Sequence, residues 1–268
     1  NYNKLLANPG NPLINRAVTG TLYAPGSVFK IIVAATALAN GYKPTDTFPN
    51  PAKFQLPGTS TYIYNSGEGK CGGKPRVSIA DALRFSCNIP FAQLGLALGQ
   101  DKIRQQAELF GFGKKVSVPI SVTPSTYPSG MDDAQTALSS FGQFDDRVTP
   151  MQMAMVSAAI ANGGKLMTPT LVNYVQSSTL SILSQTVPSQ LATPVTSEVA
   201  AGVKQMMIGA VSKGVSSNGQ IKGVEVAGKT GTAQNGGDLP YTLWFTGFAP
   251  ANNPKVAVAV VVEDGGGM

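Results

Sequence analysis

The chain has 268 residues, of which 43% are hydrophobic and only 13% are charged, roughly half the charged share of an average soluble domain. It contains no histidine, which excludes Ser-His-Asp and Cys-His catalysis and every histidine metal site. Its 20 Lys and Arg against 14 Asp and Glu give a net charge of +6, but the basic residues are scattered, so no nucleic acid is expected as a partner. Two cysteines cannot form a structural zinc site by themselves. No apolar run reaches the roughly 18 residues of a membrane span, and no signal peptide begins at Asn1. Because the sequence starts without Met, it is expected to be a fragment of a longer protein.

The first clear element is an apolar helix. Residues 27–40 are apolar on every side, which predicts a helix buried inside the domain, and Gly41 suits its C-terminal cap. Residues 42–75 are rich in Pro, Gly, Thr and Asn and predict extended loop or short strand. Further helices are predicted from residue 78 to a break at 86–88, and then at residues 90–99, 101–110, 150–163 and 197–212.

In the last third of the chain, the hydrophobic pattern changes from that of helices to that of strands. Residues 223–234, 242–250 and 255–264 are strand-like and are joined by short connections rich in Gly or Asn. Consecutive strands with such short links pair antiparallel. Helices that precede a sheet in this way favour an α+β fold over a doubly wound parallel sheet.

Lys30 is the only charged residue between Ser27 and Tyr42. An ammonium in an apolar, buried helix is unfavourable unless it is paired or deprotonated. Ser27 lies three residues earlier, so both side chains share one helix face, at a helix start whose free N–H groups favour an oxyanion. A neutral lysine beside a hydroxyl is one of the few bases that a histidine-free chain offers. The alternative is a lysine whose stem packs along the helix while its ammonium reaches solvent.

Two further segments strengthen the catalytic interpretation. Ser86 and Asn88 fall in the break between two helices, where a hydroxyl and an amide can project together. The segment Lys229-Thr230-Gly231-Thr232 lies in an otherwise apolar strand, where glycine permits close approach of another backbone or a ligand. Alone, Ser-x-Asn is often a turn or cap, and Lys-Thr-Gly is often a strand end. Together with Ser-x-x-Lys, these motifs are typical of penicillin-binding proteins and class A β-lactamases.

The sequence therefore resembles the transpeptidase domain of class B penicillin-binding proteins. The resemblance extends over most of the chain, through the segments 15–30, 141–143, 149–154, 160–164, 226–234 and 244–250. It implies an α+β fold in which an antiparallel sheet is covered by helices on both faces and joined to an all-helical lobe, as in serine β-lactamases. One transpeptidase domain would span residues 1–268. Its mostly helical lobe, with the second motif, would cover about 42–165, and its sheet-containing lobe would cover 1–41 and 166–268.

The resemblance also implies a location and a biological role. The family's N-terminal membrane anchor and pedestal domain are not in this chain, and neither is the helix that usually follows the last strand. The domain would be extracytoplasmic, on a protein anchored to the cytoplasmic membrane. It would act in peptidoglycan synthesis and cell wall biogenesis, during cell division or in the maintenance of cell shape.

The resemblance implies a serine acyl-enzyme without cofactor or metal. Ser27 would attack the penultimate D-Ala carbonyl of a stem peptide with Lys30 as base, and Ser86 would relay the proton to the leaving D-Ala. Lys229 would supply positive charge. The backbone N–H groups of Ser27 and Thr232 would form the oxyanion hole. The substrate-binding residues would be Asn88 for its side amide and Thr230, Gly231 and Thr232 around its carboxylate.

The expected partners are peptidoglycan stem peptides or their lipid-linked precursor, and β-lactams, which would acylate the same serine. Proteins of cell division or elongation would bind through the absent N-terminal part. One alternative is a hydrolase, either a D,D-carboxypeptidase or a β-lactamase. A β-lactamase needs an added base for water; none of the candidates by residue type lies in a matching motif, namely Glu68, Glu108, Asp132, Asp133, Asp145 and Asp146. Another alternative is a non-catalytic penicillin sensor.

Cys71 and Cys87 are the only cysteines. In an extracytoplasmic domain they can form a disulfide, which would hold the segment of Ser86 and Asn88 in place. A bridge requires Cα atoms within about 7 Å. The alternative is two free thiols, with Cys87 as a small buried residue.

Overall fold

The computed structural model describes residues 1–67, 69–116 and 118–266. Its main sheet has three antiparallel strands, in the order β11-β10-β9, formed by β9 (Ala227–Ala233), β10 (Tyr241–Ala249) and β11 (Val256–Gly265). Along β10, Trp244 and Thr246 are buried on one face, whereas Phe245 between them is half-buried on the other. The sheet thus has one face in the core, as the alternating pattern of these strands requires.

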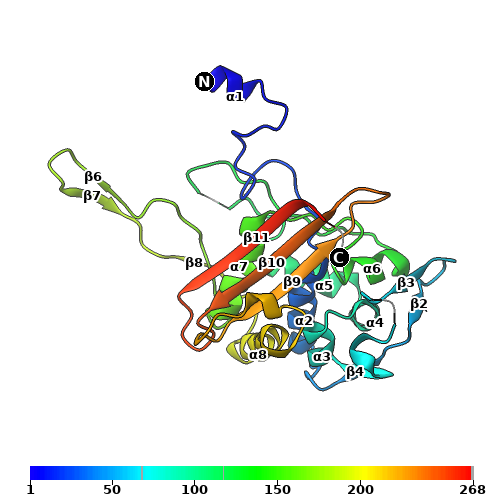
Figure 1. Ribbon diagram of the computed structural model, residues 1–268. Coiled ribbons are helices and arrows are strands. Elements are labelled where there is room, and N and C mark those ends of the chain that lie inside the picture. The colour runs from blue at the N-terminus through cyan, green and yellow to red at the C-terminus, as the bar shows by residue number, and fades with distance from the viewer. Residues whose placement is uncertain (68, 117, 267–268) are drawn as a thin grey trace.

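Helices cover the inner face of the sheet. α7 (Pro150–Ala161) packs on β10 and β11, α8 (Ser197–Lys213) packs on β9, and α2 (Lys30–Ala39) lies against α8. In Figure 1 the three strands lie in front of α2 and α7. α2 is buried along almost its whole length, which confirms the prediction of a buried apolar helix.

Among the described residues the outer face of the sheet carries no α-helix, and only the short 3-10 turn at Ser217–Gly219 contacts it, at Phe245. Val256, Val258, Val260 and Val262 of β11 point to that face and are 40–59% exposed. The α+β class and the antiparallel sheet are confirmed, but the expected helices lie on one face only.

The rest of the core is a lobe of short helices around α2. It contains α3 (Ile79–Arg84), α4 (Asn88–Leu98), α5 (Gln100–Leu109) and α6 (Asp133–Ser139). The lobe is not all-helical. Two small ladders occupy the Pro- and Gly-rich region: β1 (Thr47–Pro49) with β4 (Arg76–Ser78), and β2 (Lys53–Gln55) with β3 (Tyr62–Tyr64). α7 falls within the range expected for the helical lobe but packs on the sheet.

A long two-stranded ribbon projects from the body (Figure 1). It is formed by β6 (Tyr174–Gln176) and β7 (Ile182–Gln185) above a short ladder of β5 (Leu166–Met167) and β8 (Gln190–Ala192). The remaining short elements are α1 (Tyr2–Leu6), η1 (Gly26–Phe29), η2 (Cys71–Gly73) and η3 (Ser217–Gly219). No helix among the described residues is both long and apolar enough to cross a membrane.

Side-chain caps mark the starts of α3, α6, α7 and α8. Thr149 accepts a hydrogen bond from Gln152 N, with Pro150 as the first residue of α7. α6, which the sequence analysis does not predict, begins at a complete capping box between Asp132 and Gln135. The predicted helix at 27–40 starts as the 3-10 turn η1 and becomes α-helical only at Lys30.

Candidate functional site

Ser27 lies in η1, which is pressed against strand β9. Gly26, the first residue of η1, has φ +54°, and a Cβ there would come within 2.6 Å of the Thr232 carbonyl oxygen. A Cβ on Gly231 would likewise come within 2.9 Å of the Pro25 carbonyl oxygen. Both positions need glycine because the two backbones touch. Ser27 is thereby held beside Thr232, half-buried, at the edge of the sheet.

The segment before Ser27 is tied to its surroundings by long-range hydrogen bonds. Gly26 N donates to the Gly142 carbonyl at 2.9 Å, and Tyr23 forms an antiparallel bridge with Val148. Trp244 Nε1 donates to the Ala24 carbonyl at 3.0 Å. These contacts fix the segment before Ser27 between the 141–148 segment and β10.

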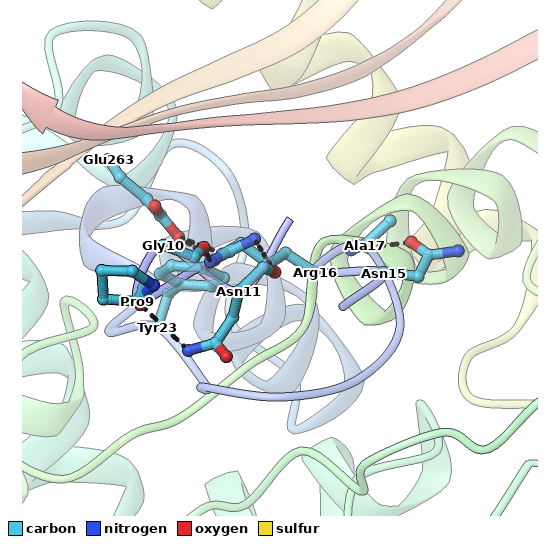
Figure 2. Close-up of polar contacts among 8 residues, drawn as sticks. All are labelled: Pro9, Gly10, Asn11, Asn15, Arg16, Ala17, Tyr23 and Glu263. Atoms are coloured by element: carbon cyan, nitrogen blue, oxygen red, sulfur yellow. Dashed lines mark hydrogen bonds and ion pairs between the residues drawn. The ribbon is translucent and has the colours of Figure 1, made fainter. Parts of the chain in front are cut away.

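Figure 2 shows a further tie at the start of this segment. The Tyr23 hydroxyl donates to Glu263 of β11, and Arg16 lies 3.5 Å from the same carboxylate. The Arg16 guanidinium also donates to the carbonyls of Gly10 and Asn11. Burial and the neighbouring Glu263 carboxylate raise the pKa of Tyr23 to about 12, so the phenol remains a hydrogen-bond donor at physiological pH.

Lys30 Nζ is the centre of the site. It lies 3.0 Å from Ser27 Oγ, 2.8 Å from Asn88 Oδ1, and 2.7 Å and 3.4 Å from the carbonyl oxygen and the hydroxyl of Ser86. The side chain is fully buried, so the alternative of a lysine that reaches solvent is wrong. A hydroxyl within hydrogen-bond reach of a buried amine is the arrangement of a nucleophile with its base.

A second buried lysine approaches from the sheet. Lys229 Nζ, on β9, donates to Ser86 Oγ at 2.8 Å and to the Thr230 carbonyl at 2.9 Å. Burial, and secondly the charge of Lys229, lowers the pKa of Lys30 well below its usual range. Burial lowers the pKa of Lys229 to about 7. One hydroxyl, that of Ser86, therefore stands between two amines that deprotonate easily.

Ser86 and Asn88 are presented by the break between α3 and α4. Ser86 has φ +60°, a left-handed conformation that is uncommon for a residue with a side chain and is often found at functional sites. Cys87 between them forms a disulfide with Cys71, with a Cα–Cα distance of 5.6 Å. The bond ties the motif to the loop that carries Cys71.

The rest of the strand motif lines the edge of the site. Thr230 and Thr232 are half-buried on β9. Ser216 is fully buried and holds Thr230 by accepting a hydrogen bond from its backbone N–H at 2.9 Å. A cavity of about 590 Å³ opens beyond the end of β9, but no predicted catalytic side chain lines it. The hydrogen-bond network around Lys30, rather than a hollow, defines this site.

The structure thus brings Ser27, Lys30, Ser86, Asn88 and Lys229 into one network, with Thr230, Gly231 and Thr232 beside it. The candidate water bases behave differently. In the parts of the chain that the structure describes, no carboxylate hydrogen-bonds to a member of this network. Glu68 lies outside the described residues; the other candidates pair with arginines, cap or begin α6, or are buried elsewhere, namely Glu108, Asp145, Asp132, Asp133 and Asp146.

Several polar residues of the site region were missed by sequence reasoning. Asn50 and Asn65 support the second motif, and Ser216 supports the third. Each stands in a loop rich in small polar residues, where one more Asn or Ser carries no signal. Trp244 was noted only as part of a resembling segment.

The fold is that of a penicillin-binding transpeptidase. The family profile "Penicillin binding protein transpeptidase domain" matches residues 1–268, and the chain belongs to this family. Peptidoglycan D,D-transpeptidase PbpA of Mycolicibacterium smegmatis is 41% identical over 269 residues, covering 99% of this chain and 54% of the relative. The chain thus spans about half the length of the curated relatives it matches.

Solved structures agree with this assignment. The crystal structure of PBPA from Mycobacterium tuberculosis superposes with a TM-score of 0.92 at 40% identity, covering 98% of this chain and 60% of that one. The imipenem acyl-enzyme complex of the same protein gives a TM-score of 0.94 and covers 99% of this chain and 61% of that one. The chain is thus similar to mycobacterial penicillin-binding protein A along almost its whole length.

Proposed function

We propose that this domain is a serine D,D-transpeptidase that cross-links peptidoglycan stem peptides through an acyl-enzyme and is acylated by β-lactams. The observation that carries the proposal is the contact of buried Lys30 Nζ with Ser27 Oγ, at 3.0 Å. A neutral amine there can take the serine proton, which a chain without histidine must achieve by other means. The relatives named peptidoglycan D,D-transpeptidase and the β-lactam acyl-enzymes of PBPA add to it.

In the acylation step, Ser27 Oγ attacks the carbonyl of the penultimate D-Ala and its proton passes to the neutral Lys30 amine. The amide C–N bond then breaks, and the terminal D-Ala leaves after its nitrogen has taken a proton. The route for that proton is Ser86, whose hydroxyl contacts both Lys30 and Lys229. A β-lactam follows the same path, except that the cleaved ring nitrogen remains attached to the adduct.

Substrate recognition is assigned to the sheet edge and to Asn88. The hydroxyls of Thr230 and Thr232 would bind the terminal carboxylate near the positive charge of Lys229, with Gly231 permitting close approach. Asn88 Oδ1 faces Lys30 and Nδ2 donates to the Tyr64 carbonyl, which leaves its second N–H hydrogen for the substrate's side amide. The N–H groups of Ser27 and Thr232 would stabilise the oxyanion, an effect of about 2.7–4 kcal/mol per donor.

An amine acceptor fits this site better than water. No carboxylate of the described residues hydrogen-bonds to the proposed catalytic network, so a dedicated base that would activate water is lacking there. This is expected of an enzyme whose acyl-enzyme reacts with an amine. The sensor alternative fits less well, because Ser27, Lys30, Ser86 and Lys229 are all connected.

We infer that the site lies at the seam of two lobes. Ser86 and Asn88 come from the lobe that begins near Tyr42, whereas Ser27 and Lys229 come from the sheet-containing part. Since α7 packs on the sheet, the first lobe is better ended near Thr149 than at 165.

The biological setting follows from the same assignment. Peptidoglycan lies outside the cytoplasmic membrane, where a disulfide such as Cys71–Cys87 persists, so the domain is assigned an extracytoplasmic location. Partners from division or elongation, the lipid-linked precursor and a membrane anchor preceding this domain stay predictions from the sequence resemblance.

Mass spectrometry after exposure to penicillin tests the proposal. The wild-type chain should gain one adduct, mapped to the peptide that contains Ser27, and Ser27→Ala should gain none while its thermal transition stays nearly unchanged. Ser178→Ala, at the exposed turn of the β6–β7 ribbon, is the matched control and should be acylated normally. An adduct that persists on Ser27→Ala contradicts the assignment.

A second assay separates the activities. With a stem-peptide or thioester donor and an amine acceptor, a transpeptidase forms the cross-linked product. A carboxypeptidase or β-lactamase instead releases the hydrolysed product, whereas a sensor forms the penicillin adduct but turns over neither donor.

A further inference from the structure

Asn65, in the loop after β3, is almost fully buried, with 2% of its surface exposed, and it uses its whole side-chain amide. Its Oδ1 accepts hydrogen bonds from the backbone N–H groups of Asn88 and Ile89, at 2.9 Å and 3.1 Å. Its Nδ2 donates to Asn50 Oδ1 at 3.0 Å and to the Gly69 carbonyl at 3.1 Å. Both lone pairs and both N–H hydrogens therefore have partners.

These bonds cap helix α4 from a distance. The local N-cap residue, Cys87, forms no side-chain cap, so the first N–H groups of α4 would otherwise lack an acceptor. Asn65 supplies it from 23 residues upstream. The capped residue, Asn88, is the one whose Oδ1 accepts from Lys30 Nζ at 2.8 Å.

Asn50 holds Asn65 in turn. It is fully buried, and its Nδ2 donates to the carbonyls of Cys71 and Lys74, at 2.7 Å each. An unbroken chain of side-chain hydrogen bonds and one cap thus runs from Asn50 through Asn65 and Asn88 to Lys30. Lys70 and Lys74 of this loop are exposed, so their charges are screened by solvent.

We propose that Asn65, supported by Asn50, is a positioning residue that sets the orientation of the Asn88 amide and, through it, of the Lys30 amine. This inference rests on the proposed function. The position of Lys30 Nζ depends on where Asn88 Oδ1 sits, and Asn88 is held by Asn65 on its backbone and by the adjacent Tyr64 carbonyl on its Nδ2. Loss of the Asn65 amide should therefore change the reaction, not only the stability.

Asn65→Asp distinguishes positioning from a purely structural role. The carboxylate keeps the acceptor for the Asn88 and Ile89 N–H groups but loses the donor to Asn50. It also adds a negative charge that only Asn88 separates from Lys30 in the hydrogen-bond chain. A nearby anion favours the ammonium form of Lys30 and so raises its pKa. The acid limb of the acylation pH profile should move up by about one unit, which makes acylation about tenfold slower on that limb.

The experiment measures the rate of acylation by a fluorescent penicillin from pH 5 to pH 10, with the adduct mapped by mass spectrometry. Asn65→Asp should give the shifted limb, and Asn65→Ala should slow acylation about tenfold or more at saturating penicillin with little change of limb, because it removes the cap without adding charge. Asn50→Ala, one step further from Lys30, should give a smaller loss and keeps the test valid if an Asn65 variant fails to fold.

Gln106→Glu and Gln106→Ala are the matched controls. Gln106 is a buried amide on α5 that donates to the Pro194 carbonyl at 2.8 Å, outside the catalytic network. These variants should lower the melting temperature but leave the pH profile of acylation unchanged.

The outcomes are separable. A wild-type pH profile and rate in folded Asn65→Asp, or the same shift in Gln106→Glu, overturns the positioning role. Absence of a Ser27 adduct on the wild-type chain rejects the proposed function, and with it this inference, by a different observation.

Discussion

At the scale of single residues, the proposed chemistry of the site depends on two buried lysines that share one hydroxyl. Lys30 and Lys229 both contact Ser86 Oγ, and two ammonium groups so close together would repel each other. Burial, and secondly the charge of Lys229, lowers the pKa of Lys30 well below its usual range, so its amine is assigned as the neutral one. Lys229 then carries the positive charge, up to the pH at which it also deprotonates.

Exchange of either lysine for arginine tests this division of roles. Lys30→Arg should lose acylation as fully as Lys30→Ala, about 10²-fold to 10⁴-fold, because guanidinium stays protonated and cannot act as a base. In the wild-type chain, acylation should decline above about pH 7, where Lys229 loses its proton. Lys229→Arg keeps the charge, so it should retain part of the activity and move this decline to higher pH. Stopped-flow acylation against pH measures both effects, and a wild-type rate in Lys30→Arg refutes the base role.

Asp146 is a buried acid outside the proposed catalytic network. It is fully buried, and neither carboxylate oxygen has a hydrogen-bond partner. The guanidinium of Arg147 turns instead to Asp145 and to backbone carbonyls. Burial raises the pKa of the Asp146 carboxyl well above its usual range, and the charge of Arg147 opposes this shift only in part.

Asp146→Leu should therefore stabilise the domain. The folded state holds the Asp146 proton more tightly than the unfolded state, so the penalty is absent below pH 3.8 and grows as the pH rises toward the raised pKa. The variant should gain about 1 to 3 kcal/mol at pH 7 and less at pH 3.5, where the carboxyl is protonated and only the cost of its missing hydrogen bonds remains. Urea unfolding at the two pH values measures the gain. An equal gain at both would mean that apolar packing, not ionisation, is responsible.

At the scale of elements, the disulfide and the two buried asparagines stabilise the same piece of chain. The Cys71–Cys87 disulfide joins two residues 16 positions apart in the sequence, and Cys87 lies directly between Ser86 and Asn88. Asn50 binds the carbonyl of Cys71 from the other side. The start of α4 is thus fixed covalently as well as through hydrogen bonds.

Reduction of this disulfide should slow acylation more than it lowers stability. The bridge contributes about 3 kcal/mol in the chain-entropy description, which a core of this size can lose without unfolding, but the loosened segment carries the second motif. Thiol titration of denatured, unreduced protein should give no free thiol, and two per chain would reject the bridge. Cys71→Ser with Cys87→Ser should reproduce the slower acylation. A wild-type rate in that double variant would show that the hydrogen bonds suffice.

At the scale of the whole molecule, the catalytic body and the projecting ribbon are separate. The ribbon's large apolar side chains are exposed, among them Leu180 at 75% and Leu183 at 68%. Its strands pack only on each other among the principal contacts of the described residues. The ribbon contributes nothing to the network around Lys30.

Removal of the ribbon should leave acylation intact. Thr186 N donates to the Asn173 carbonyl at 2.8 Å, so the two ends are close enough for a Gly-Ser pair to replace residues 174–185. The shortened chain should be acylated at the wild-type rate with nearly the same melting temperature, measured by fluorescent penicillin and by calorimetry. A large loss of acylation would mean that the ribbon supports the catalytic body.

The prediction from sequence was strongest where the signal is local. The apolar residues 27–40 predicted the buried helix, whereas for Lys30 a buried base and a solvent-reaching lysine were both left open. The strand-like segments after Gly223 predicted the antiparallel sheet. The short ladders β1–β4 and β2–β3 and the ribbon were not predicted as such, because strands of three or four residues depend on partners that propensity does not identify. The lack of an α-helix on the described outer face of the sheet was also not predicted, because it depends on which segments pack against that face.

The amino-acid sequence by itself determined which chemistry is possible. It lacks histidine, so a lysine is the candidate base, and its three motifs supply Ser27 with Lys30, Ser86 with Asn88, and Lys229. Only the tertiary structure decided how these groups meet. Ser86 reaches Lys30 across 56 residues and Lys229 across 143, and Asn65 caps a helix that its own neighbours leave uncapped. Hydrogen-bond partners this far apart in sequence are selected by the packing of α2, α4 and β9. Local patterns specify elements, whereas distances between side chains of different elements exist only after the core has formed.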